Sequence, residues 1–219
     1  MLLALAMLLA VAAGSCQPAA ASTAPAMSPA VSPVPAAGGV GAGGAGGDDD
    51  AGRSRKGEEF VRGCCARTLY PRLCTAALSP YAATVNSSHA RLAVASANLT
   101  AGAISGLGGR ILSSTASTEP AASSGALRDC AEAVASAADL AARAAERLAV
   151  GPEVLWRVRD AQTWLSAAMT YEDTCDDALR PARSAPSPVR AELRAGVRRA
   201  MKHTSIALAL VHMLITTGA

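Results

Sequence analysis

Aromatic residues are scarce in this 219-residue chain. It has one Phe, two Trp and three Tyr, so aromatic side chains make up only 3% of it. Sheet proteins fill their cores with Val, Ile, Tyr and Phe at alternating positions, and no stretch alternates long enough to indicate a strand. The core must therefore come from Leu, Val, Ile and above all Ala, which favours closely packed helices.

Concentrated positive charge is missing as well. The chain carries 20 Lys and Arg against 17 Asp and Glu, a net charge of +3 that is spread along the sequence. Nucleic-acid-binding domains gather Lys and Arg into one patch, so we expect no nucleic-acid partner. This charge implies only a weak attraction to acidic polysaccharide.

Catalytic and cofactor motifs are also lacking. The sequence has no G-x-S-x-G elbow, no glycine loop that would cradle phosphate and no dinucleotide fingerprint. None of the three histidines stands in a local signature with a cysteine nucleophile. Cys64, Cys65 and Cys74 do not have the separated pairs that zinc ligands form. We therefore expect a protein without catalytic activity, cofactor or metal.

The first 57 residues contain two segments of unusual composition. Residues 1–13 are an apolar run that is short for crossing a bilayer and is followed by small residues suited to cleavage. We interpret residues 1–21 as a secretory signal peptide, and Cys16 leaves with it or lies just beyond the cut. Residues 22–57 are rich in Ala, Pro, Ser and Gly and cannot bury enough apolar surface to offset their ordering entropy. They predict a disordered linker, which leaves residues 58–219 as one domain with no membrane segment after signal removal.

Helical periodicity appears in six stretches of that domain, separated by Pro, Gly and Ser clusters. The stretches span residues 58–67, 71–78, 87–114, 121–149, 153–170 and 188–216. In the last one, apolar or small residues recur at spacings of three and four and predict one inward stripe: Leu193, Val197, Ala200, Thr204, Ala207, Val211 and Leu214. The first two stretches are short and form a hairpin. We expect an all-α fold, an up-and-down four-helix bundle with an N-terminal helical hairpin and two disulfides.

Six cysteines in an exported chain indicate a disulfide framework. A bond between Cys65 and Cys74 would clamp the short hairpin, which has few apolar side chains to hold itself. A bond between Cys130 and Cys175 would join two long helices. Cys64 is left over, and three fates remain open for it: replacing Cys65, staying free or pairing between molecules.

Two sequons support export through a secretory pathway. They begin at Asn86, in Asn-Ser-Ser, and at Asn98, in Asn-Leu-Thr. Both are acceptor sites for N-glycosylation in such a pathway. We expect both asparagines to be available for glycans.

Three ordered motifs resemble those of the plant invertase and pectin methylesterase inhibitor family. They are FVRGCCARTLYPRLC (60–74), ALRDC (126–130), and QTWLSAA (162–168) followed by CDD (175–177). The likeness runs from residue 60 almost to the C-terminus. It implies a four-helix bundle with a hairpin, the same two disulfides, no catalytic activity and export to the cell wall. The extra Cys64 and the long linker depart from the family pattern.

The resemblance also implies a partner. Some members of this family block pectin methylesterase by laying bundle helices over its substrate cleft in a one-to-one complex, and others block acid invertases. The run from Gln162 is similar to the methylesterase branch, and the Pro-Lys-Phe motif of invertase inhibitors is absent. The resemblance places Thr174 at the enzyme contact, and we expect Glu172, Asp173 and Asp176 to join it at the surface.

The leading hypothesis is therefore a secreted inhibitor of pectin methylesterase that acts in the apoplast. An inhibitor of cell-wall or vacuolar acid invertase is the alternative. A glycosylated structural wall protein, in which the Pro- and Ser-rich tract carries glycans, is the second alternative.

Overall fold

The computed structural model describes residues 47–117, 121–150, 155–180 and 187–217. All regular structure in these ranges is helical, which confirms the all-α prediction. The predicted signal peptide with Cys16, and residues 22–46 of the predicted linker, lie outside the described residues.

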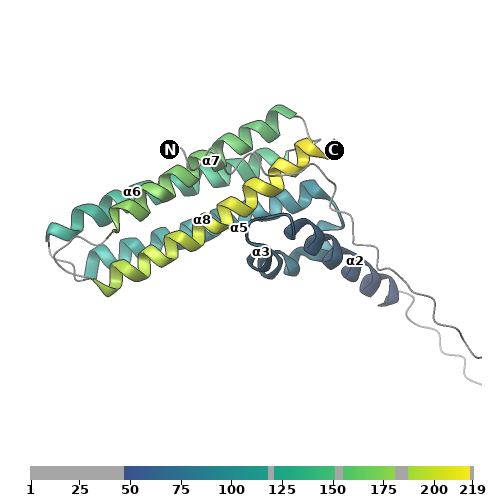
Figure 1. Ribbon diagram of the computed structural model, residues 1–219, viewed down its shortest axis with the longest axis horizontal. Helices are drawn as coiled ribbons and strands as arrows, with labels where there is room; N and C mark the ends of the chain where they lie inside the picture. The colour runs from purple at the N-terminus through teal and green to yellow at the C-terminus, as the bar shows by residue number, and fades with distance from the viewer. Residues whose placement is uncertain (1–46, 118–120, 151–154, 181–186, 218–219) are drawn as a thin grey trace, which may run out of the picture.

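Four long helices build an up-and-down bundle: α5 (His89–Ser117), α6 (Ala121–Ala149), α7 (Leu155–Ala178) and α8 (Pro188–Thr216) (Figure 1). Helices that follow one another in the chain pack side by side, and α8 closes the ring by packing against α5. Helices α5 and α7 therefore lie diagonally across the bundle. The predicted bounds of α6 and α8 are confirmed, whereas α7 continues past the predicted end at residue 170 as far as Ala178.

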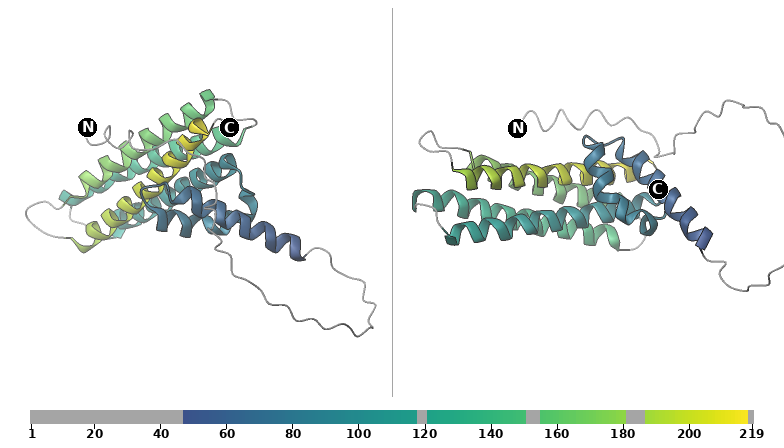
Figure 2. Two further views of the ribbon diagram at one scale, coloured as in Figure 1. Left: turned by 45° about the vertical axis from the view of Figure 1, so that its right-hand side comes forward. Right: turned by 90° about the horizontal axis from the view of Figure 1, so that it is seen from below.

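The predicted hairpin lies against one end of the bundle and consists of α2 (Gly47–Cys65), α3 (Pro71–Leu78), the 3₁₀ turn η2 (Ser79–Tyr81) and α4 (Ala82–Val85). Helix α2 begins at Gly47, so the prediction that residues 47–57 belong to a disordered linker is wrong for this stretch. Good helix formers such as Arg55, Lys56 and Glu58 extend the helix toward the N-terminus despite its glycines. The first part of α2 projects away from the bundle (Figure 2).

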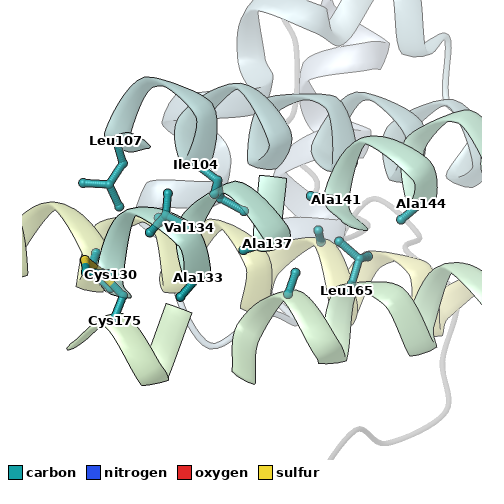
Figure 3. Packing of buried hydrophobic residues seen from close by; sticks show 14 of the residues in the cluster. Ile104, Leu107, Cys130, Ala133, Val134, Ala137, Ala141, Ala144, Leu165 and Cys175 are labelled. Carbon is teal, nitrogen blue, oxygen red and sulfur yellow. A yellow bond between two sulfur atoms is a disulfide. The ribbon is translucent and has the colours of Figure 1, made fainter. Parts of the chain in front are cut away.

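The bundle core is rich in alanine. Ala137, Ala141 and Ala144 of α6 face Ile104 and Leu165 from neighbouring helices (Figure 3), and all five are fully buried. Small side chains let the helix backbones approach closely, so few aromatic residues are needed to fill the interior. The stripe predicted on α8 from Leu193 to Leu214 is buried at all seven positions, which confirms it.

A second apolar cluster fixes the hairpin to the bundle. Phe60, Val61 and Leu78 of the hairpin pack together with Leu210 and Met213 of α8. The crossing of α2 and α4 is tight at Gly57, where a Cβ atom would overlap the carbonyl group of Ala82. The hairpin is thus part of the folded domain and not a loose extension.

Both predicted disulfides are present. Cys65 and Cys74 join α2 to α3 with their Cα atoms 5.4 Å apart, and Cys130 and Cys175 join α6 to α7 with their Cα atoms 4.3 Å apart. Cys64 is fully buried and is itself disulfide-bonded. It is therefore neither a free thiol nor a replacement for Cys65 in the short bond.

Helix α5 is apolar enough, by length and composition, to cross a membrane over residues 89–114. In the bundle it packs against α6 and α8. Most of its larger apolar side chains, among them Ile104, Leu107 and Ile111, are buried there, whereas Leu112 is 60% exposed. Its hydropathy is accounted for as that of a core helix.

Candidate functional site

The four predicted contact residues near the end of α7 divide into two pairs. Asp173 and Thr174 are exposed. Glu172 is completely buried and Asp176 is only 6% exposed. The prediction that Glu172 and Asp176 lie at the surface is therefore wrong, because both turn inward on the side of the helix that carries Cys175.

Glu172 is an isolated acid inside the bundle. Neither of its carboxylate oxygens has a hydrogen-bond partner in the described structure. Burial raises the pKa of its carboxyl group to about 8, and the neighbouring Thr204 hydroxyl on α8 lowers the pKa by a smaller amount. Because a charged carboxylate without partners is costly in a low-dielectric interior, Glu172 is protonated in the folded protein at neutral and acidic pH.

Asp176 is the centre of an ion cluster between α7 and α8. Its carboxylate accepts two hydrogen bonds from Arg194, at 3.0 and 2.9 Å, and one from Arg198 at 3.1 Å. Burial alone would raise the pKa of Asp176, but the hydrogen bonds and charges of the two arginines outweigh it and hold the pKa below its ordinary value. Arg190, one turn earlier on α8, donates to the carbonyl oxygen of Ala178 at 2.9 Å. The cluster fixes the C-terminal end of α7 against α8.

Replacing Asp176 with Asn should destabilise the fold by roughly 2–3 kcal/mol, because two arginines then lose their shared carboxylate in a largely buried place. The matched control is Asp177→Asn, which removes an exposed ion pair with Arg180 and should cost at most about 0.5 kcal/mol. Urea unfolding of both variants at neutral pH checks this. Equal losses would mean that the Asp176 cluster does not hold the helices together.

The outward side of α7 forms a band of small polar side chains, which we call the α7 polar face. It consists of Thr163, Ser166, Thr170, Asp173, Thr174 and Asp177, all exposed. The threonine hydroxyls donate to backbone carbonyls four residues earlier, and that of Thr174 donates to Thr170 at 2.9 Å. Such short side chains leave the helix surface low and able to lie flat against another protein, with hydroxyl oxygens still able to accept hydrogen bonds.

Aromatic and arginine side chains border the α7 polar face. Trp156 near the start of α7 is 50% exposed and Tyr171 beside Thr170 is 42% exposed. The guanidinium group of Arg147 on α6 lies 5.3 Å from the Trp156 ring and 5.1 Å from the Trp164 ring. Arg143 lies 4.6 Å from the Trp164 ring. Exposed Trp, Tyr and Arg are the residues most enriched where proteins bind one another.

Neither a cysteine nucleophile nor a metal site is supported by the described residues. Each cysteine there is in a disulfide, whereas a cysteine nucleophile needs a free thiol. No group of three or more His, Cys, Asp or Glu side chains in the described ranges could hold a metal ion.

The two sequon asparagines are both accessible. Asn86 ends α4 in a left-handed conformation with φ 47°, which asparagine tolerates better than most residues. Asn98 lies on the outward side of α5. Glycosylation at these positions stays a prediction.

Comparison with known proteins identifies the family. Residues 59–210, which include the hairpin and nearly all of the bundle, match the sequence profile described as plant invertase/pectin methylesterase inhibitor. The chain belongs to this family. Its expected membership, based on the cysteine motifs and the run from Gln162, is thereby confirmed.

Several relatives within the family are similar in sequence or fold. Pectinesterase inhibitor 6 of Arabidopsis thaliana is 31% identical over 161 residues, which is 73% of this chain and 77% of that protein. Pectinesterase inhibitor 11 of the same plant is 29% identical over 178 residues, or 73% and 82% of the two chains. A crystal structure of a mutant form of an Arabidopsis pectin methylesterase inhibitor aligns with a TM-score of 0.56 at 23% identity, covering 68% of this chain and 93% of that one. At that identity the structural likeness bears on the fold alone.

Proposed function

We propose that this protein inhibits pectin methylesterase and so limits the removal of methyl esters from pectin. The observation that carries the proposal is the alignment of relatives named pectinesterase inhibitors over most of both chains. The predicted signal peptide supports export, and we propose the plant cell wall as the site of action. The sequence similarity favours the methylesterase over acid invertase as the target.

The proposed mechanism is steric. The α7 polar face lies over the substrate cleft of the enzyme in a one-to-one complex, with Thr174 and Asp173 in the contact. The Cys130–Cys175 disulfide and the Asp176 cluster hold the end of α7 against α6 and α8, so little conformational entropy is lost on binding. No bond of the substrate is broken by the inhibitor, which acts by excluding pectin from the cleft.

The function is tested by assaying one preparation of the oxidised protein against two enzymes. Excess protein should stop demethylesterification of pectin by a plant pectin methylesterase at mildly acidic pH and leave sucrose hydrolysis by a plant acid invertase unchanged. If only the invertase loses activity, the protein is an inhibitor of acid invertase and not of pectin methylesterase. Full activity of both enzymes at excess protein would contradict the proposal.

A large side chain at Thr174 should weaken inhibition about ten- to a hundredfold, since residues at the centre of a protein interface contribute most of its affinity. Thr174→Arg should leave the fold intact, because the side chain is exposed and its hydroxyl bonds only its own helix. Ser105→Arg is the matched control, as Ser105 is exposed on α5, diagonally across the bundle. Inhibition constants for both variants check the interface, and equal constants would move it away from α7.

A further inference from the structure

A hollow of about 510 Å³ lies between the start of the hairpin helix α3 and the middle of α8. Tyr70, Arg72 and Leu73 form one wall, and Arg198, Arg199 and Lys202 form the other. We call it the basic groove. It has the volume of a small-ligand site, and α7 does not contribute to it.

The charge in the basic groove is of one sign. Four cations line it and no acidic side chain does. Arg198 shares the Asp176 carboxylate, but its side chain is still 56% exposed. Arg72 and Arg199 make no ion pair with a carboxylate of the described residues. Cations gathered without acids repel one another in the free protein, and an anionic ligand would relieve that repulsion.

One cation of the groove is held in place before any ligand arrives. The ammonium group of Lys202 lies 5.5 Å from the centre of the Tyr70 ring, a cation–π arrangement that restricts the lysine side chain. Tyr70 and Leu73 are both partly exposed and add an apolar surface beside the charges. The apolar C–H faces of sugar rings pack on such surfaces, whereas a bare phosphate ion would not use them.

The cations are also spread along the groove. Arg198 precedes Lys202 by four residues of α8, and Arg199 precedes it by three. Each spacing is about one helical turn, or roughly 5 Å along the helix axis. Arg72 lies on the opposite wall. This spread suits a linear ligand whose charges repeat at each unit, and guanidinium groups bind carboxylates with paired hydrogen bonds.

We propose that the basic groove binds linear polyuronides, polysaccharides with one carboxylate on each sugar unit. Such a polymer supplies both the repeated carboxylates and the sugar faces that the groove can accept. De-esterified pectin belongs to this class, so the protein would bind the polymer that a pectin methylesterase produces. The groove does not depend on inhibition, and binding is measured without any enzyme.

The test is isothermal titration calorimetry of the oxidised protein with oligogalacturonate at low salt. Arg199→Gln with Lys202→Gln should weaken binding about tenfold or more, because two charge-assisted contacts are lost. Arg62→Gln with Arg128→Gln is the control, since it removes the same charge from exposed positions on α2 and α6 and should change affinity less than about twofold. Equal weakening by both pairs would overturn the groove as the site, and so would an absence of binding by the wild-type protein.

Two further ligands and one variant test whether the basic groove recognises carboxylates on sugar rings or any chain of acidic groups. Fully methyl-esterified oligogalacturonate should bind at least about tenfold more weakly, because its carboxylates are masked. Tyr70→Ala should weaken binding of oligogalacturonate more than binding of poly-glutamate, because both ligands lose the restrained Lys202 but only the sugar loses the apolar surface. If poly-glutamate binds as tightly as oligogalacturonate and loses the same affinity in each variant, the groove recognises acidic protein and the proposal is wrong.

Discussion

Replacing Glu172 with Gln is expected to stabilise the protein strongly at pH 8 and hardly at all at pH 4.5. Burial raises the pKa of this carboxyl group from 4.5 to about 8 in the folded state. Between these values the folded chain holds a proton that the unfolded chain releases, so stability is complete below pH 4.5 and falls as the pH rises toward 8. At about 1.4 kcal/mol for each pH unit in that window, the loss reaches at most about 5 kcal/mol. Gln keeps the shape of the side chain and cannot ionise, so the variant escapes this loss.

The measurement is the free energy of unfolding in urea, taken at intervals from pH 4.5 to 8 for wild type and Glu172→Gln. Burial, with a smaller effect of Arg67 and Arg199 respectively, lowers the pKa values of His89 and His203. Their contributions to stability therefore increase as the pH rises from these lowered pKa values to 6.5 and stay constant above it, whereas that of Glu172 falls with rising pH. Both proteins keep these histidines, so the difference between the two curves isolates Glu172. Curves that stay parallel across the range would contradict the buried, protonated acid.

The buried acid by itself favours folding in acidic surroundings. The penalty for Glu172 disappears toward pH 4.5, where the carboxyl group is neutral in both folded and unfolded chains. In a mildly acidic cell wall, the proposed site of action, Glu172 would lower the free energy of unfolding only slightly. At neutral or alkaline pH it would lower the free energy of unfolding more.

Removing the Cys130–Cys175 disulfide should cost about 4 kcal/mol, the second large effect. The bond closes a loop across 45 residues and restricts the unfolded chain accordingly. The matched control is the Cys65–Cys74 bond, which spans nine residues and should contribute roughly 2.6 kcal/mol by the same entropy argument. Paired Cys→Ala variants compared by urea unfolding check the order. A larger loss from the short bond would show that loop entropy does not dominate.

The long disulfide should also matter for inhibition. Cys175 directly follows Thr174, so the bond fixes the end of the α7 polar face to α6. Without it, local opening of this end becomes easier even while the rest of the bundle stays folded. The Cys130→Ala, Cys175→Ala variant should therefore inhibit less well at temperatures where it is still folded.

The helices that could be predicted best are those whose ends carry strong sequence signals. Helix α8 begins at Pro188, where proline is tolerated in the first turn and the Ser187 side chain caps the helix. Its inward stripe follows the helical period without interruption. The predicted end of α7 at residue 170 falls too early, because the acidic residues Glu172, Asp173 and Asp176 that follow it are expected at the surface and not inside a bundle helix.

The sequence did contain a signal for the true course of α7. Leu165, Ala168, Glu172, Cys175 and Leu179 recur at spacings of three and four, and all are buried. Glu172 therefore occupies a core position, but its chemical type argued for the surface. Periodicity should have outweighed residue type here, because a carboxyl group can become neutral when it is buried.

Other parts of the site depend on how helices meet and could not be read from one segment. The ion cluster of Asp176 needs α7 and α8 in a particular register, although Arg190, Arg194 and Arg198 recur every four residues and mark one side of α8. The basic groove likewise needs the hairpin to lie against α8. Its arginines and lysine looked scattered along the chain because their neighbours come from distant segments.

The most direct test of the account is a calorimetric titration of pectin methylesterase with the oxidised protein at mildly acidic pH. We predict saturable binding with one inhibitor for each enzyme, and much weaker binding by Thr174→Arg than by Ser105→Arg. A folded, oxidised protein that forms no complex with the enzyme, or one that binds it equally well with either substitution, would contradict the claim that α7 closes the cleft.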